Sequence, residues 1–334
     1  MDSKTTSQNI KSAFVNNGFV TFLKNNIEDF SRVLIVIFLV VTLSLVTTNF
    51  ATFPNLMNVL RAASLNLILA TGLAFTMLVS GIDLSIGSII ALSTMVFAPY
   101  FQEGRTILEM VYGIAGILVL SSAIGMINGS AVAFLRLPPF LVTFAIGNIA
   151  RGLSYYLTRG TVFAKFTPTF RFIGSGELFG IPMPVIFAGL VLILVGLLLN
   201  KTVFGRRIYA VGSNREAAHY SGIKVNKTII SAYMLSALIA GFGGIIYLSR
   251  LNAAEAYIGL DFHLNAISAA AIGGISFKGG RGNVFGIIIG ALLLTLVNNG
   301  MNLLGVQSDW QMGITGLIII IGVLLDRSYT KRQE

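Results

Sequence analysis

The chain has 334 residues and a formal net charge of +10 at pH 7; 55% of its residues are hydrophobic and 11% are charged. An average soluble domain carries about 25% charged residues, so this chain cannot cover a compact fold with polar side chains, and a soluble enzyme is excluded. The sequence has no cysteine and only two histidines, His219 and His263, which leaves no candidate for a disulfide, a cysteine-linked haem or a metal cluster.

The first 31 residues are polar, with scattered Lys, Glu and Asp. They lack the apolar core of a cleavable signal peptide. We therefore predict a cytoplasmic tail over 1–31, followed by a first hydrophobic segment that stays in the membrane as a signal anchor.

Apolar residues come in runs without charge, such as 34–46, 185–199 and 314–325. With their small flanking residues, these runs reach the ~20 residues that cross the hydrocarbon core as a helix. Backbone groups find no hydrogen-bonding solvent in lipid, and the runs do not alternate as barrel strands would. We predict an all-α polytopic membrane helix bundle over 32–326, with about ten transmembrane helices and a tail at 327–334. The predicted spans are 32–50, 57–79, 84–101, 108–134, 138–157, 183–200, 229–249, 263–277, 284–304 and 310–326.

Basic residues are divided unevenly between the two sides of these spans. With the N-terminus inside, 16 of the 23 Lys and Arg residues fall on the inner side, and 7 fall outside or near the outer ends. Positively charged loops stay in the cytoplasm, so we predict both termini inside, a long inner loop at 201–228 and an external segment at 158–182. The same rule accounts for the net charge without nucleic acid as a partner.

The break between the second and third predicted spans falls at 80–83, where Asp83 interrupts an apolar stretch. A carboxylate within the membrane is a functional candidate, and a protonatable one would suit a proton-coupled carrier. Asp83 also precedes the start of a predicted helix, where a negative charge is stabilising. We favour this structural role.

The inner loop at 201–228 contains a short predicted helix. Ser213 and Glu216 have the spacing of a capping box, residues 217–219 continue the helix, and Gly222 supplies a left-handed residue that ends it. About two turns of helix are not stable alone in water, so we expect a partner surface to hold it. The alternative is an ordinary solvated loop with a helical turn.

Glu216-Ala217-Ala218, followed by Gly222, resembles the EAA…G coupling motif of ATP-binding-cassette (ABC) importer permeases. The surrounding stretches are similar to the ribose-type sugar branch, which is related to the branched-chain amino acid permeases. Matching stretches run in order from about residue 55 to 326: GIDLSIGS at 81–88, LPPFLVT at 137–143, AIGGISFKGGRG at 271–282, NNGMNLL at 298–304 and the closing 316–326.

This resemblance implies a permease subunit that translocates a monosaccharide, a ribose-like pentose or a related sugar, across the cytoplasmic membrane of a bacterium. It implies no cofactor in this chain, because ATP is bound and hydrolysed by a cytoplasmic ABC ATPase. Further implied partners are an extracytoplasmic sugar-binding protein, a second permease copy or paralogue, and membrane lipid. The implied coupling residues are Ser213, Glu216, Ala217, Ala218 and Gly222.

Three alternatives stay open beside it: a branched-chain amino acid ABC permease, a proton-coupled secondary carrier and a membrane-embedded enzyme. For the enzyme, no catalytic constellation is evident in the spans. The GGRG stretch at 279–282 lacks the Gly-Lys-Ser/Thr ending of a phosphate-binding loop, so we predict a tight turn between two spans.

Polar and aromatic residues within the spans are candidates for the substrate pathway, because amides and hydroxyls bond sugar hydroxyls without charge. For each of them, hydrogen bonding between helices or simple packing is an equally good interpretation. The candidates are Asn66, Asp83, Phe140, Thr143, Asn148, Asn298, Asn299 and Asn302.

Overall fold

The computed structural model describes residues 27–307, 309–318 and 320, and these residues are mostly helical. The helices are α3 (Ile27–Val46), α4 (Phe53–Leu78), α5 (Ile86–Phe97), α6 (Ile107–Phe134), α7 (Pro139–Thr158), α8 (Pro168–Ser175), α9 (Met183–Lys201), α10 (Val203–Ser213), α11 (Arg215–Tyr220), α12 (Val225–Leu251), α13 (Phe262–Ile272) and α14 (Val284–Leu303), with a 3-10 turn η1 (Ala98–Phe101) after α5. Residues 309–318 are also helical, so the predicted span at 310–326 lies partly outside the described residues, as do most of the tail at 1–31 and all of the tail at 327–334.

Local sequence sets several of the helix starts. A proline lies in the first turn of α4, α7 and α9, where its missing N–H costs nothing and its fixed φ suits a helix. Helix α6 begins with a capping box in which Thr106 accepts a hydrogen bond from the Glu109 backbone N–H and the Glu109 carboxylate accepts one from the Thr106 backbone N–H.

In the part of the chain that the structure describes, five helices are long and apolar enough to cross a membrane: α4, α6, α9, α12 and α14. They coincide with five of the predicted spans, which confirms a helical membrane bundle. The predicted spans at 84–101 and 263–277 correspond to shorter helices. Helix α5 has 12 residues before η1, and α13 has only 11, which at 1.5 Å per residue rises about 16 Å. The helix predicted at 263–277 is shorter in the structure: α13 ends at Ile272, and Gly274 follows with φ +83°.

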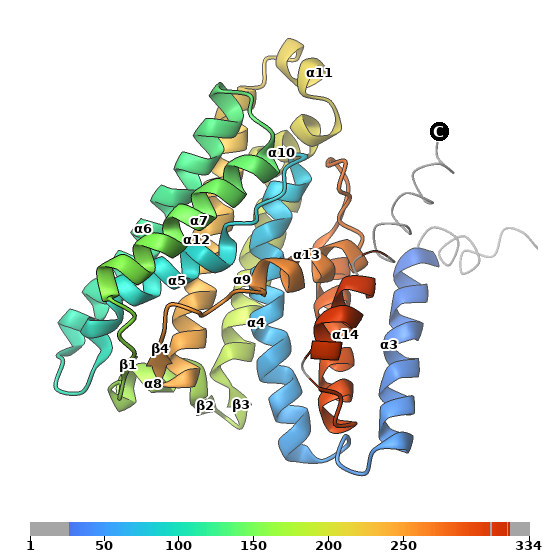
Figure 1. Ribbon diagram of the computed structural model, residues 1–334. Helices are drawn as coiled ribbons and strands as arrows, with labels where there is room; N and C mark the ends of the chain where they lie inside the picture. The colour runs from blue at the N-terminus through green and yellow to red at the C-terminus, as the bar shows by residue number, and fades with distance from the viewer. Residues whose placement is uncertain (1–26, 308, 319, 321–334) are drawn as a thin grey trace, which may run out of the picture.

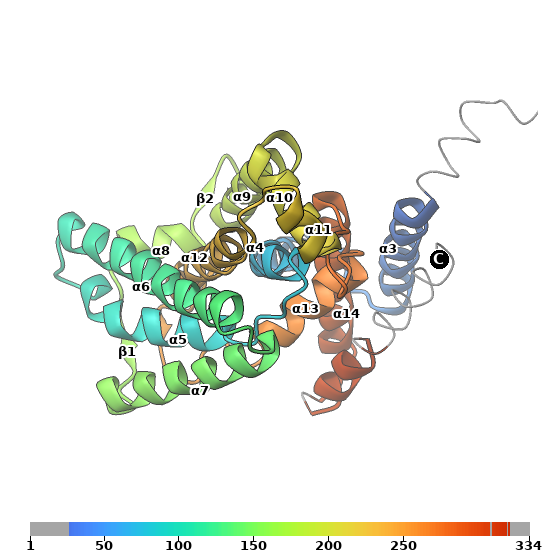
Figure 2. The ribbon, with the colours of Figure 1, turned by 90° about the horizontal axis from the view of Figure 1, so that it is seen from above.

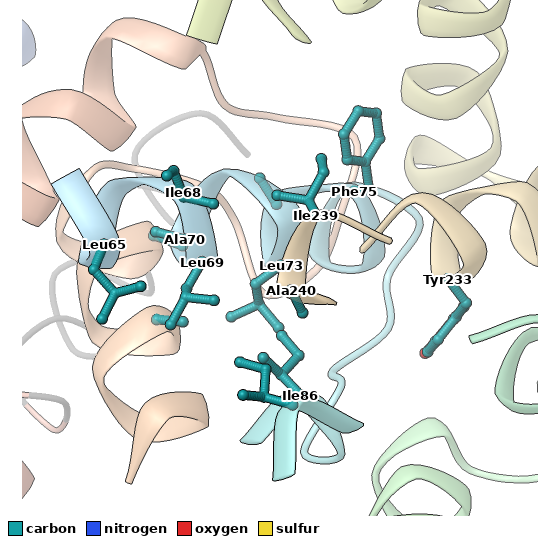
Figure 3. Close-up of a cluster of buried hydrophobic side chains, with 14 of the residues drawn as sticks. Leu65, Ile68, Leu69, Ala70, Leu73, Phe75, Ile86, Tyr233, Ile239 and Ala240 are labelled. Carbon is teal, nitrogen blue, oxygen red and sulfur yellow. The ribbon is translucent and has the colours of Figure 1, made fainter. Parts of the chain in front are cut away.

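Helices α4 and α12 form the centre of the bundle, and α6 packs along α12 (Figure 2). A Cβ on Gly125 of α6 would lie 2.5 Å from the Tyr233 carbonyl oxygen of α12, and one on Gly129 would lie 2.7 Å from the Ile230 Cα. These glycines let the two backbones touch, which is how helices associate in lipid. Figure 3 shows the α4 side of this core, where Leu73 lies beside Ala240 of α12 and Ile86 of α5.

The two ends of the bundle differ (Figure 1). One end, here called the α11 end, carries α10, α11 and the loop between α13 and α14. The opposite end carries α8 and two small antiparallel sheets: β1 (Phe163–Ala164) pairs with β4 (Ala253–Ala254), and β2 (Glu177–Leu178) pairs with β3 (Ile181–Pro182). The segment predicted to lie outside the membrane at 158–182 is therefore an ordered cap at the opposite end from α11.

Candidate functional site

The short helix α11 stands at one end of the bundle and is held by a cap at each end. Its N-cap is Asn214, whose Oδ1 accepts a hydrogen bond of 2.9 Å from the Ala217 N–H. The predicted capping role of Ser213 is wrong, because Ser213 is the last helical residue of α10, whereas Asn214 has the extended backbone (φ −160°, ψ 110°) that an N-cap needs.

The C-terminal end of α11 follows the prediction. Gly222 has φ +80°, its N–H donates to the His219 carbonyl at 2.9 Å, and the Ile223 N–H donates to the Ala218 carbonyl at 3.0 Å. This pair of bonds is the Schellman motif, in which the left-handed residue is most often glycine. The predicted left-handed end of the helix at Gly222 is confirmed.

The two alanines of α11 face in different directions. Ala218 is 4% exposed and packs against the bundle, whereas Glu216, Ala217 and His219 are exposed and Tyr220 is 88% exposed. The outward surface of α11 is thus formed by Glu216, Ala217, His219 and Tyr220. The small Ala217 leaves room for another surface to approach the helix closely.

Three chain segments meet beneath α11 and form what we call the junction: the end of α4 (78–80), residues 212–215, and the 278–280 part of the α13–α14 loop. Ser80 Oγ lies 2.9 Å from the Gly212 carbonyl oxygen and 2.7 Å from that of Lys278. The Gly280 N–H donates to the Leu78 carbonyl at 2.9 Å, and Arg215 Nη2 donates to the Val79 carbonyl at 3.1 Å.

The predicted tight turn at 279–282 is part of this junction. Gly279, Gly280 and Gly282 all have positive φ, at 83°, 69° and 140°, and a Cβ on Gly280 would lie 2.2 Å from Ser213 Oγ. The turn prediction is confirmed. Ser213 contributes by packing against Gly280, and it does not cap α11.

Beyond the junction the chain runs without helix through residues 81–85, here called the crossover, and enters α5. Asp83 lies in the crossover with a fully buried side chain. Its Oδ1 accepts hydrogen bonds from the Ser85 N–H at 2.9 Å and from Ser85 Oγ. Ser85 Oγ in turn accepts from Asn128 Nδ2 of α6 at 2.8 Å. Asp83 is thus fixed three residues ahead of α5 by its bonds to Ser85, the N-cap residue of that helix.

Thr143 of α7 holds the other side of the crossover. Its Oγ1 accepts a hydrogen bond from the Leu84 N–H at 3.0 Å and lies 3.2 Å from the Ile82 carbonyl oxygen. The structure therefore brings together Asp83 and Thr143, two of the predicted pathway residues. On the same helix α7, Phe140 is 51% exposed and Asn148 is exposed.

The predicted pathway amides of α4 and α14 form a separate group. Asn66 Nδ2 donates to Thr295 Oγ1 at 2.9 Å, Asn299 and Asn55 exchange bonds of 2.9 and 3.2 Å, and Asn302 accepts from Gln311 at 2.9 Å. Asn298 is partly buried on α14. These bonds join α14 to α4 and to the segment that follows α14, which fits the alternative of hydrogen bonding between segments.

Sequence reasoning missed Arg151 on α7. Its Nη1 donates to the carbonyl oxygens of Ala256 and Ile258 at 2.6 and 2.7 Å, and so holds the loop between β4 and α13. The partners are backbone atoms more than 100 residues away, so no local pattern signals the contact.

These features define a polytopic membrane protein in which a capped helix projects at one end of a helical bundle. A family model described as "Branched-chain amino acid transport system / permease component" matches residues 55–323. The chain belongs to this permease family, and it is a membrane transport subunit, in agreement with the resemblance seen in its motifs.

Several curated proteins are similar over most of their length. The ribose import permease protein RbsC of Escherichia coli (strain K12) is 39% identical over 292 residues, covering 86% of this chain and 90% of the relative. RbsC of Bacillus subtilis (strain 168) is 38% identical, covering 86% and 89%. The D-allose transport system permease protein AlsC of Escherichia coli (strain K12) is 36% identical, covering 84% and 86%. No solved structure matches the chain significantly.

Proposed function

We propose that this chain is the permease subunit of an ABC importer that carries a monosaccharide across the cytoplasmic membrane of a bacterium, driven by ATP hydrolysis in a partner subunit. The observation that carries the proposal is α11, a capped helix of six residues whose sequence has the EAA…G pattern and whose outward surface is exposed. A helix this short, projecting from a membrane bundle, suits docking to a second protein.

A sugar is favoured over an amino acid as the substrate. The family description names branched-chain amino acids, but the relatives described above are named for ribose and allose, and another relative is named for galactose and methyl galactoside. We propose a ribose-like pentose or a related monosaccharide as the substrate of this chain.

We further propose that the chain crosses the membrane about ten times, with both termini in the cytoplasm. The orientation is supported by the α11 end, where the exposed basic residues of the 201–228 loop gather: Lys201, Arg206, Arg207, Arg215, Lys224 and Lys227. Positive charge of this kind is held on the cytoplasmic side. In this arrangement α5 and α13 complete their spans with the non-helical segments that precede them.

The partners follow from the same orientation. The cytoplasmic ABC ATPase docks on Glu216 and Ala217 of α11, with Ala218, Gly222 and Ser213 holding the helix in place. The extracytoplasmic sugar-binding protein delivers substrate at the opposite end, where α8 and the two small sheets lie. A second copy or paralogue of the permease completes the pathway, and lipid surrounds the bundle.

We place the substrate pathway beside α5 and α7. Phe140, Thr143 and Asn148 lie on α7, and Thr143 accepts a hydrogen bond from Leu84, the residue after Asp83. The amides Asn66, Asn298, Asn299 and Asn302 are a second group of pathway candidates. Within this group, Asn66, Asn299 and Asn302 also hold α14 in position through their hydrogen bonds.

The test is uptake of radiolabelled ribose into proteoliposomes that contain the permease, its ATPase and its binding protein, with allose, galactose and leucine as competitors. We expect uptake that needs the ATPase and ATP, survives a protonophore and is inhibited by the sugars alone. Uptake that persists without the ATPase and collapses with the protonophore would identify a secondary carrier. Uptake of radiolabelled leucine in the same proteoliposomes, with no uptake of ribose, would identify an amino acid permease.

A further inference from the structure

Ser80 occupies a backbone position that glycine normally fills. It is the left-handed residue at the end of α4, with φ +61°; its N–H donates to the Met77 carbonyl at 2.9 Å, and the Gly81 N–H donates to the Thr76 carbonyl at 2.8 Å. This is the same Schellman arrangement as at the end of α11. A side chain at positive φ costs free energy and persists where its surroundings hold it. The Ser80 hydroxyl is held between the carbonyl oxygens of Gly212 and Lys278.

The segments around Ser80 are in backbone contact, so that one cannot slide without displacing another. A Cβ on Gly212 would lie 1.8 Å from the Leu78 carbonyl oxygen and 2.5 Å from the Gly280 nitrogen. Packed interiors of this kind transmit displacement and do not absorb it. A movement of α11 and the end of α10 therefore displaces the end of α4.

Residue 81, directly after Ser80, begins the crossover, which contacts three long helices. Ser85 Oγ accepts from Asn128 of α6, and the Leu84 N–H donates to Thr143 of α7. A Cβ on Gly81 would lie 2.3 Å from the Tyr233 hydroxyl of α12. The crossover therefore connects the junction with helices on the side where we place the substrate pathway.

We propose that Ser80 is a positioning residue of the transport cycle: its hydroxyl joins the coupling loop to the crossover and so passes a displacement of α11 to α6 and α7. This inference rests on the proposed function, because it requires an ATPase that moves α11. Within that function, Ser80 is the contact through which a movement driven by ATP hydrolysis is passed to the substrate pathway.

The test compares wild type, Ser80→Ala, Ser80→Gly and Ser122→Ala in the reconstituted importer. Ser80→Ala removes the hydroxyl and keeps a side chain at positive φ, whereas Ser80→Gly removes the hydroxyl and relaxes the backbone. Ser122→Ala is the matched control, because Ser122 Oγ bonds only the Leu118 carbonyl of its own helix, at 2.7 Å. The measurements are the amount of ATPase that co-purifies, the ATPase rate, and the number of sugar molecules moved per ATP.

We expect both Ser80 variants to retain the ATPase and to hydrolyse ATP, while sugar moved per ATP falls about fivefold, the factor that corresponds to one hydrogen bond of ordinary strength. Ser122→Ala should match wild type. An unchanged ratio in Ser80→Gly would overturn the inference and leave the proposed function standing, since wild type remains coupled in the same assay. A wild type without ATPase-dependent uptake would overturn both. Loss of co-purifying ATPase in the Ser80 variants would also overturn the inference, because Ser80 would then act on docking.

Discussion

Gly87 and Gly259 bring two distant parts of the chain into backbone contact: a Cβ added to Gly87 would lie 1.9 Å from the Gly259 carbonyl oxygen. Gly87 is in the first turn of α5, and Gly259 precedes α13 by three residues and has φ +75°. The N-terminal ends of two short helices therefore meet within the bundle. In many secondary transporters, discontinuous helices form the substrate site.

Gly87→Ala should destabilise the protein, because the new methyl group has to displace backbone, not a flexible side chain. Overpacking of this kind costs about 1–3 kcal/mol. The measurement is the thermal unfolding midpoint in detergent, with Gly189→Ala as the control, since a Cβ on Gly189 meets nothing within 4 Å. Equal midpoints for the two variants would mean that the contact between α5 and the α13 approach is loose.

Ala217→Glu and Ala218→Glu should fail in different ways, although the two residues are adjacent. Ala217 is exposed and Ala218 is 4% exposed. Ala217→Glu should leave the unfolding midpoint unchanged and abolish co-purification of the ATPase. Ala218→Glu should lower the midpoint, because a buried, unpaired carboxylate is costly. If Ala217→Glu retains the ATPase, α11 is not the docking helix.

Asp83→Asn distinguishes the structural role of Asp83 from a proton-carrying one. The amide oxygen of Asn can accept the same two hydrogen bonds from Ser85 that Asp83 Oδ1 accepts. We therefore expect folding and ATP-driven uptake to be retained in Asp83→Asn. Asp83→Leu, which removes the acceptor, should lower the unfolding midpoint and uptake together. Complete loss of uptake in a stably folded Asp83→Asn would contradict the structural role.

The reciprocal pair Asn55–Asn299 should contribute measurably to the packing of α14 on α4. A double-mutant cycle with Asn55→Ala and Asn299→Ala should give a coupling free energy of about 0.6–1.7 kcal/mol, the range found for hydrogen bonds between membrane helices. The measurement is unfolding in mild detergent. Additive effects of the two single variants, accompanied by loss of uptake in Asn299→Ala alone, would instead place Asn299 in the pathway.

Hydropathy and local chemistry were sufficient for much of the fold. Apolar runs located the helices because a helix is the structure that satisfies its own backbone in lipid, and the left-handed residues at Gly222 and in the 279–282 turn were readable because glycine alone adopts them without strain. The α11 cap was misplaced by one residue because Ser213 and Asn214 are both good N-caps. Which of them caps α11 depended on where α10 ended.

The sequence by itself determined that the chain is a helical membrane permease with a short EAA-type helix in the 201–228 loop, since composition, periodicity and ordered motifs are local properties. Only the tertiary structure decided which of two adjacent alanines faces outward, and which of the eight candidate pathway residues lie near the crossover. It alone showed that Ser80, Gly212 and Gly280 meet at one point. The Ser80 hydroxyl alone joins residues 132 and 198 positions apart in the chain, and the side-chain pattern along a chain carries no record of such contacts.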